Sequence, residues 1–248
     1  MDQNPFQRLE VLLGKDAVQR LANSFVIICG MGAVGSYATE ALARAGIGKL
    51  RLIDFDDVRL SNINRQLFAL HSTMGKAKCE IAKDRVLDIN PNCQVEAVRG
   101  FIAEETIAEF LSGNPDMVID AIDSLNSKAT LLDAAKKMQL PLLASMGAAL
   151  RRDPSLIRIG NLPEVRNCPL ARLLKKRLKN RNADLNIRCV YSIEPDNPHA
   201  IMTLEDSDPH DLQAFNRGRL RRPMGSMSTV TGIFGLLLAH DTINKITA

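Results

Sequence analysis

The fold is decided by the run Phe25-Val26-Ile27-Ile28-Cys29 and the turn after it, Gly30-Met31-Gly32-Ala33-Val34-Gly35. An unbroken apolar run predicts a strand buried on both faces of a parallel sheet. The turn matches G-x-G-x-x-G, and a helical stretch from about Val34 to Ala45 follows it. In this context glycines let the backbone approach a phosphate, and the helix start offers N–H groups to the anion. We therefore predict that a nucleotide binds at Gly30, Gly32, Ala33 and Gly35.

Strand and helix patterns alternate on both sides of this unit. The expected strands are Leu50–Ile53, Val95–Val98, Met117–Ile122 and Leu142–Ser145. The expected helices are Phe6–Ala22, Asn62–Leu70, Met74–Leu87, Ala103–Leu111 and Leu125–Met138. The alternation predicts an α/β fold, a doubly wound Rossmann-like and mostly parallel sheet.

Beyond residue 146 the order loosens. We expect strands at Ile157–Ile159 and Cys189–Ser192, a basic helix at Cys168–Lys179, a loop at Asp196–Arg222 and a final helix at Gly225–Ile246. The apolar core of that last helix is far shorter than the ~20 residues of a membrane span. We expect one domain over residues 1–248, with a nucleotide-binding half (1–146) and a substrate-facing half (147–248).

Composition excludes several classes of protein. Of the 248 residues, 46% are hydrophobic and 24% charged, which excludes a mostly disordered or collagen-like chain. The absence of Trp and the 4% aromatic content argue against a base-stacking single-strand binder. The five cysteines show no C-x-x-C spacing, which disfavours a zinc knuckle. The first residues carry no secretion signal, so we expect a cytoplasmic protein.

Charged residues after two strands point to a triphosphate. Asp54 ends the second expected strand, where a carboxylate can accept both ribose hydroxyls, and Asp123 follows the strand Met117–Ile122. Carboxyl ends of strands converge on one crevice in this fold, so both carboxylates should face it. Arg65 and Lys78 can reach the same place. Two cations and a carboxylate suit ATP with Mg²⁺, because the cations neutralise phosphate charge and Asp123 can hold the metal.

Five motifs occur in order along residues 6–146. They are the glycine turn, Leu52-Ile53-Asp54-Phe55-Asp56, Ser61-Asn62-x-x-Arg65-Gln66, Gly75-x-x-Lys78 and Asp120-x-x-Asp123. Together they resemble the superfamily of ubiquitin-activating-like adenylyltransferases, which includes the molybdopterin-synthase and thiamine-pathway activating enzymes. The resemblance implies a homodimer that binds ATP and Mg²⁺.

The same resemblance assigns roles to individual residues. It places Asp54, Asp56 and Asn62 at the nucleotide, with Asp54 and Asn62 on the ribose side. It places Arg65 and Lys78 at the phosphates and Asp123 at Mg²⁺. Arg8 is similar to an arginine that reaches into the partner subunit's nucleotide site. Ala33 departs from the pattern, where relatives often carry a third loop glycine.

Four further segments resemble one branch, the tRNA threonylcarbamoyladenosine dehydratases: Ala41–Gly48, Asp120–Ser124, Ser145–Ala148 and Arg188–Ser192. The branch implies ATP-dependent cyclisation of N6-threonylcarbamoyladenosine in the anticodon loop of tRNA, through an acyl-adenylate. The missing zinc cysteines agree with this branch. Two alternatives stay open: an adenylyltransferase for a ubiquitin-like sulfur carrier, with a sulfur-relay partner, and a non-catalytic or redox protein that binds NAD.

Basic residues gather in the second half of the chain. One cluster is Arg172, Lys175, Lys176, Arg177, Lys179 and Arg181, and a second is Arg217, Arg219, Arg221 and Arg222. This distribution suits a phosphate backbone, and a solvated surface is the alternative.

Cys189 is a weak candidate for a reactive thiol. It follows Arg188, and a neighbouring cation can lower a thiol pKa. The alternative is a cysteine packed in a strand, and Cys168, before Pro169, is a weaker candidate of the same kind.

Overall fold

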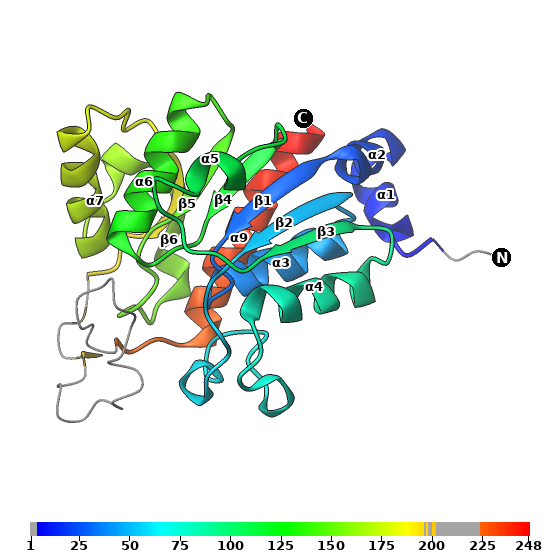
Figure 1. Cartoon of the computed structure of the whole chain (residues 1–248), viewed down its shortest axis with the longest axis horizontal. Coiled ribbons are helices and arrows are strands. Elements are labelled where there is room, and N and C mark those ends of the chain that lie inside the picture. The colour runs from blue at the N-terminus through cyan, green and yellow to red at the C-terminus, as the bar shows by residue number, and fades with distance from the viewer. Residues whose placement is uncertain (1–3, 196, 198–199, 202–223) are drawn as a thin grey trace.

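The computed structural model describes residues 4–195, 197, 200–201 and 224–248. Within this part of the chain, seven strands form one sheet in the order β3-β2-β1-β4-β5-β7-β6 (Figure 1). The strands are β1 (Phe25–Cys29), β2 (Lys49–Ile53), β3 (Gln94–Val98), β4 (Met117–Asp120), β5 (Leu142–Ser145), β6 (Ile157–Asn161) and β7 (Arg188–Ser192). Neighbouring strands are parallel except β6 and β7, which are antiparallel. The predicted doubly wound, mostly parallel α/β fold is confirmed.

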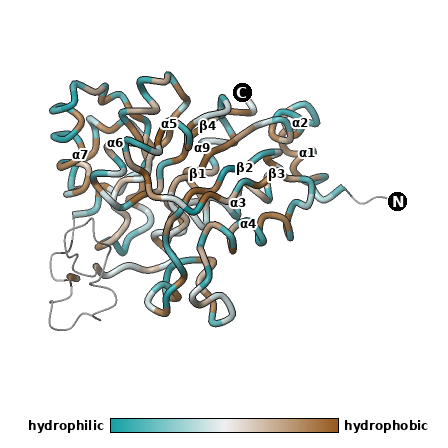
Figure 2. The backbone as a smooth tube through the Cα atoms, in the orientation of Figure 1, coloured by the Kyte–Doolittle hydropathy of each residue, from teal (hydrophilic) through white to brown (hydrophobic). Residues whose placement is uncertain are grey.

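Helices cover both faces of this sheet (Figure 1). One face carries α2 (Lys15–Asn23), α3 (Gly35–Arg44), α4 (Lys78–Ile89) and α9 (Ser228–Thr247). The other carries α5 (Ile107–Phe110), α6 (Leu125–Lys137) and α7 (Pro169–Asn180). β1 supplies both cores, because Val26 and Ile28 pack on the first face and Phe25, Ile27 and Cys29 on the second. Figure 2 shows hydrophobic residues along these inner strands.

The segment between β2 and α4 differs from its prediction. Asn62–Leu70 is not a helix; short 3₁₀ turns form at Leu60–Asn62 and His71–Thr73. The next helix begins at Lys78 rather than near Met74. Thr73 is the last residue of the second turn, where its hydroxyl accepts from the Leu70 N–H at 2.9 Å, and Gly75 takes a positive φ of 75°.

Two other predicted helices are shorter or interrupted. The stretch Phe6–Ala22 divides at Gly14 into α1 (Gln7–Leu13) and α2. Ala103–Leu111 is helical only over α5, since the Thr106 hydroxyl donates to the Phe101 carbonyl (2.9 Å) and accepts from the Ala103 N–H (3.1 Å). Such local bonds compete with a helical start.

The last helix, α9, packs against α3, as expected for a helix lying on the sheet. No helix among the described residues combines the length and apolarity that crossing a membrane requires. The expected loop Asp196–Arg222 and the basic cluster Arg217, Arg219, Arg221 and Arg222 fall almost entirely outside the described residues.

Candidate active site

The order of the sheet reverses at β1, which lies between β2 and β4. Three segments leave the carboxyl edge there: the Gly30–Gly35 turn after β1, Asp54 after β2 and the turn 121–123 after β4. In open parallel sheets, ligands bind in the crevice at such a reversal. The structure therefore brings the glycine turn and the predicted acidic residues to one edge of the sheet.

Gly30 and Gly35 are required by the packing of the chain itself. Gly30 has a φ of 96°, and a Cβ there would lie 2.9 Å from the Ala121 carbonyl oxygen. A Cβ on Gly35 would lie 1.7 Å from the Gly30 carbonyl oxygen. The start of α3 thus sits directly on the turn, and both press against the turn after β4.

Gly32 stands in a different environment. The nearest atom to a Cβ built there is the Gln66 Nε2, at 3.9 Å. Protein packing therefore leaves room for a side chain at this position. Steric contacts within the chain therefore do not explain the glycine at position 32. A ligand does, because a bound pyrophosphate must approach the backbone closely at the second glycine of the motif.

Asp54 fastens the glycine turn to the sheet. Its carboxylate accepts the Met31 N–H at 2.6 Å and the Asp56 N–H at 2.8 Å. Burial raises the pKa of Asp54, an effect that the nearby Lys78 ammonium opposes. One carboxylate therefore shapes the turn while lying at the place expected for a ribose ligand.

Lys78 is the first residue of α4. Its side chain is buried, and its Nζ lies 2.9 Å from the Asp56 Oδ2. The Lys78 N–H also donates to the Asp56 carbonyl at 3.0 Å. The predicted phosphate cation is thus held beside Asp54 and Asp56 by a short ion pair.

The segment Asn62–Gln66 closes over the glycine turn. Asn62 is buried, and its carbonyl accepts the N–H groups of Arg65 at 3.1 Å and Gln66 at 2.9 Å. The Leu67 N–H donates to the Ser36 hydroxyl at 3.2 Å, which joins this segment to the start of α3. Arg65 is half-buried and donates to the Ser61 carbonyl at 2.7 Å. Gln66 of this segment lies nearest to Gly32, and Asn62 and Arg65 stand in the same segment.

Asp123 lies exposed on the turn after β4. That turn is held by Asp120, whose carboxylate accepts the Ile122 N–H at 3.1 Å, and by the Ala121 N–H, which donates to the Cys29 carbonyl at 2.9 Å. Asp120 is fully buried and pairs with the fully buried Lys128 of α6. Burial raises the pKa of Asp120, and the Lys128 ammonium opposes that rise.

Lys128 is the residue that sequence reasoning missed. Its Nζ bonds the Asp120 carboxylate and donates to the Ser145 carbonyl at 2.9 Å, so it ties α6 to the carboxyl ends of β4 and β5. A lysine on an expected helix is usually solvated. The available signal was its place one turn into the helix that follows the Asp120-x-x-Asp123 motif.

Arg8 and Cys189 are not brought to the crevice of the same chain. Arg8 is exposed on α1, and its neighbour Phe6 packs near Gly46, at the opposite, amino edge of the sheet (Figure 1). Cys189 is fully buried in β7, and burial raises its pKa to about 12. The expectation that Arg188 lowers this pKa is wrong, because the Arg188 guanidinium binds both oxygens of Asp241, each at 2.6 Å.

Cys168 serves as a cap. It is buried, and its sulfur accepts the Ala171 N–H at 3.4 Å at the start of α7.

A family model for the ThiF family matches residues 6–248. The chain belongs to the ThiF family. This ThiF-family chain is 40% identical to the tRNA threonylcarbamoyladenosine dehydratase of Bacillus subtilis, over 96% of the chain and 92% of that protein. It is 35% identical to the Escherichia coli dehydratase, over 96% and 91%. The solved structure of the E. coli enzyme in complex with ATP has a TM-score of 0.84 at 34% identity and covers 98% of this chain and 93% of that one.

The Gly32→Ala variant of this ThiF-family protein tests the role of the glycine turn. The free energy of unfolding should change by no more than about 0.5 kcal/mol, because the new Cβ meets no close atom. The Kd for ATP should rise at least about tenfold, since the methyl group occupies the space of a phosphate. Isothermal titration and urea unfolding measure the two quantities.

Gly35→Ala is the matched control. Its Cβ would collide with the Gly30 carbonyl, so it should lose about 3 kcal/mol or more of unfolding free energy. Unchanged ATP affinity in a well-folded Gly32→Ala protein would contradict the assignment.

Lys128→Met tests the buried pair. It should cost about 3–5 kcal/mol at pH 7, because Asp120 keeps an uncompensated buried charge. The cost should shrink as the pH falls, because burial raises the Asp120 pKa and the folded state then takes up the proton first. Adding Asp120→Asn should restore most of the stability in urea unfolding. A Lys128→Met protein that is as stable as the wild type at pH 7 would refute the pairing.

Proposed function

We propose that this chain catalyses the ATP-dependent dehydration of N6-threonylcarbamoyladenosine in tRNA, which closes the threonyl side group into a ring. The observation that carries the proposal is the crevice at β1 and β4, where a glycine turn that leaves room at Gly32 lies beside Asp54 and Lys78. The near-full-length likeness to proteins named as this dehydratase supports the choice of substrate.

The reaction has two steps. An oxygen of the threonyl carboxylate attacks the α-phosphorus of ATP; an O–P bond forms, the bond to the β-phosphate bridging oxygen breaks, and pyrophosphate leaves. A nitrogen of the carbamoyl group then attacks the activated acyl carbon. A C–N bond forms, the C–O bond to AMP breaks, and the nitrogen loses its proton to solvent.

The chain's own residues orient and neutralise the phosphates in this scheme. The N–H groups of Gly30 and Met31 bond Ile53 and Asp54, so the later part of the turn and the start of α3 offer their N–H groups to the anion. Lys78 and Arg65 offset the charge that develops on the α-phosphate and on the leaving pyrophosphate. Asp54 and Asn62 orient the ribose.

The side chains at the crevice suit Mg²⁺ only when the ion is also bound by the phosphates of the nucleotide. No group of three or more His, Cys, Asp or Glu side chains suited to a metal occurs in the described ranges, which gives no evidence of a cage built by protein alone. Mg²⁺ in nucleotide enzymes is commonly held by one or two carboxylates, waters and phosphates, and the exposed Asp123 suits that role. When bound, the ion would neutralise triphosphate charge.

The cysteines weigh against the sulfur-carrier alternative. All five are free and buried, which offers no exposed thiol to a sulfur-relay partner. The NAD alternative is disfavoured by the buried Lys78 held at the crevice, because hydride transfer needs no cation for a triphosphate.

The deciding experiment measures ATP turnover with and without modified tRNA, followed by mass spectrometry of the nucleosides. We expect AMP and pyrophosphate to form only with the modified tRNA, together with a nucleoside that is one water lighter. Turnover that instead depends on a Gly-Gly-tailed carrier protein would favour the sulfur-carrier function.

Asp123→Ala should abolish Mg²⁺-dependent ATP turnover while unfolding stays within about 0.5 kcal/mol of wild type, because the side chain is exposed. Steady-state turnover across a Mg²⁺ titration measures the effect. Unchanged turnover at saturating Mg²⁺ would remove the assigned role.

A homodimer is part of the proposal, because Arg8 lies at the amino edge and could reach a nucleotide site only in a second subunit. Arg8→Ala and Lys78→Ala proteins should each lose activity. Random mixing should restore about a quarter of wild-type activity, since half the dimers are hybrids with one intact site. Demonstrated hybrids without recovered activity would exclude a cross-subunit role.

A further inference from the structure

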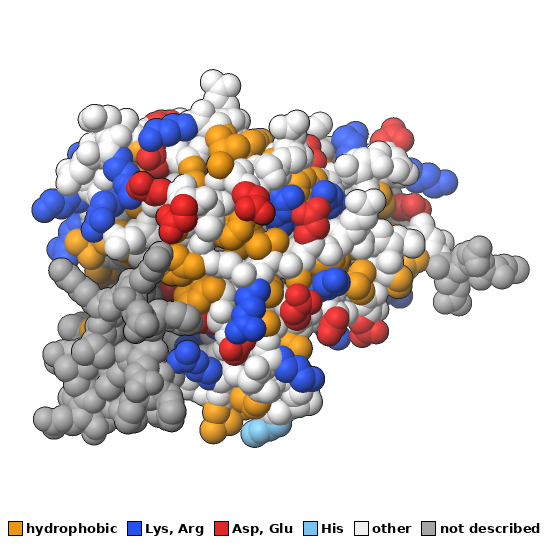
Figure 3. All heavy atoms as spheres, viewed as in Figure 1, with side chains coloured by type: hydrophobic (Ala, Val, Ile, Leu, Met, Phe, Trp, Pro, Cys, Tyr) orange, Lys and Arg blue, Asp and Glu red, His pale blue; other side chains and the backbone are white. Residues whose placement is uncertain are grey.

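The outer face of α7 is strongly basic. Residues 166–181 hold seven Lys and Arg and no Asp or Glu, although the whole chain carries a net charge of only +4. Figure 3 shows Lys and Arg side chains gathered over this helix. Such a segment repels itself unless an anion or solvent compensates its charge.

The helix is fixed in place by its apolar side. Ala171, Leu174 and Leu178 are buried in the core that α7 shares with α6. That burial leaves Arg172, Lys176, Arg177 and Lys179 exposed on the opposite side. A membrane-surface helix would need its apolar face free for lipid, and here that face is already occupied.

The cations follow the helix at a regular spacing. The spacing is three or four residues, from Arg172 to Lys175 or Lys176 and on to Lys179. One cation therefore occurs in each helical turn, about every 5.4 Å. The 12-residue helix is about 18 Å long, or about five nucleotide steps of 3.4 Å. The two repeats differ, so the row can contact several phosphates along a backbone without pairing with each one.

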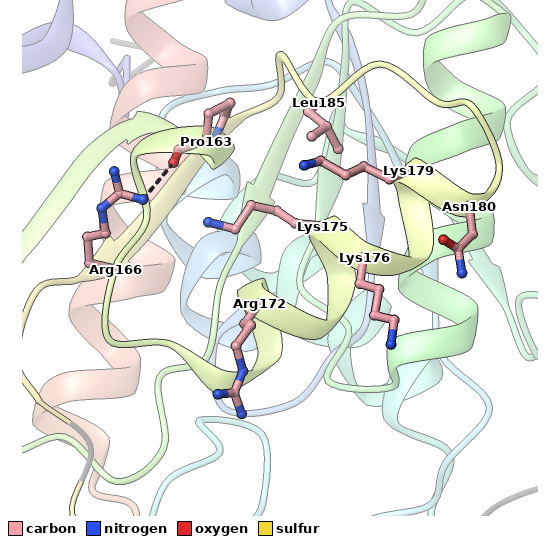
Figure 4. A pocket seen from close by; sticks show the side chains of 8 residues that line it. All are labelled: Pro163, Arg166, Arg172, Lys175, Lys176, Lys179, Asn180 and Leu185. Atoms are coloured by element: carbon pink, nitrogen blue, oxygen red, sulfur yellow. Dashed lines mark hydrogen bonds between the residues drawn. The ribbon is translucent and has the colours of Figure 1, made fainter.

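A hollow of about 510 Å³ lies beside this row. Its lining includes five cations and no acid: Arg166, Arg172, Lys175, Lys176 and Lys179, with Pro163, Asn180 and Leu185. Figure 4 shows Lys175 and Lys179 extending from α7 toward Pro163 and Leu185, with Arg172 and Lys176 extending from adjacent turns. Lys175 Nζ donates to the Val165 carbonyl at 3.0 Å, which fixes one wall of the hollow.

The row also starts at the correct edge of the molecule. Cys168 caps α7, and its sulfur lies 3.4 Å from where a Cβ on Gly147 would stand, just after the carboxyl end of β5. β5 neighbours β4, so α7 begins on the edge that holds the crevice and runs away from it. A polyanion on this helix would lead directly toward the nucleotide.

We infer that the exposed face of α7, together with Arg166, is the docking surface for the sugar–phosphate backbone of the substrate RNA, beside the crevice that receives the modified base. The choice of RNA rests on the proposed function. The position of the surface rests on the charges and the hollow.

The test neutralises three cations that hold no other element in place. In Arg172→Gln/Lys176→Gln/Lys179→Gln, the Kd for modified tRNA should rise about tenfold or more at physiological salt. The log–log salt slope should fall in magnitude by about 2 to 3, at roughly 0.7–0.9 for each lost phosphate contact. The Kd for MgATP without RNA reports whether the fold survives, and should stay within twofold of wild type.

A matched triple, Lys15→Gln/Lys83→Gln/Lys245→Gln, removes the same charge from α2, α4 and α9 and should keep the wild-type tRNA affinity and slope. Equal tRNA affinity and equal salt slope in the α7 variant and the wild type would overturn the inference. It would also be overturned if the wild-type protein bound an acidic peptide and did not bind tRNA. The Kd for tRNA is measured by filter binding, which needs no turnover. Conversion of modified tRNA by the wild-type protein is measured in a separate experiment, and that experiment tests the proposed function.

Discussion

The close approach of the Gly30–Gly35 turn to the turn after β4 is the constraint on which the rest of the structure depends. With side chains at Gly30 or Gly35, α3 could not start where it does, and β1 could not deliver its carboxyl end to the crevice. Asp54 then locks the turn through the Met31 N–H, and Asp56 brings Lys78 to the same place. Asp54, Asp56 and Lys78 are therefore positioned next to a backbone arrangement that only glycine permits.

Two kinds of charge serve two parts of the molecule. At the crevice, Lys78 and Lys128 are buried against Asp56 and Asp120, so their charges are compensated and their positions fixed. Unpaired charges in such a place would cost far more than an exposed pair contributes. On α7 the cations stand in solvent, where exposure costs little and a long anion can be bound reversibly. The first arrangement suits precise chemistry on a small nucleotide, and the second suits docking of a large one.

Much of this could be predicted from the sequence, since the inner strands are continuous apolar runs and the glycine pattern lies between a strand and a helix. The segment between β2 and α4 could not, because Thr73 and Gly75 favour a local turn that helical periodicity hides. Lys128 was missed because a helical lysine is usually solvated, and its only signal was its place one turn after the Asp120-x-x-Asp123 motif. Cys189 was misjudged because the commitment of Arg188 to Asp241, 53 residues away, is a property of the folded chain. Arg8 marks a further limit, since its proposed role belongs to a second subunit.

The central claim is that this crevice activates a carboxylate by transferring an adenylyl group to it. The most direct measurement uses tRNA whose threonylcarbamoyl carboxylate carries ¹⁸O in both oxygens, with AMP, pyrophosphate and any ADP or phosphate analysed by mass spectrometry. The account predicts one ¹⁸O in each AMP and none in pyrophosphate, because ring closure leaves the attacking oxygen on the α-phosphorus. Label in inorganic phosphate accompanied by ADP, or AMP without label, would contradict it.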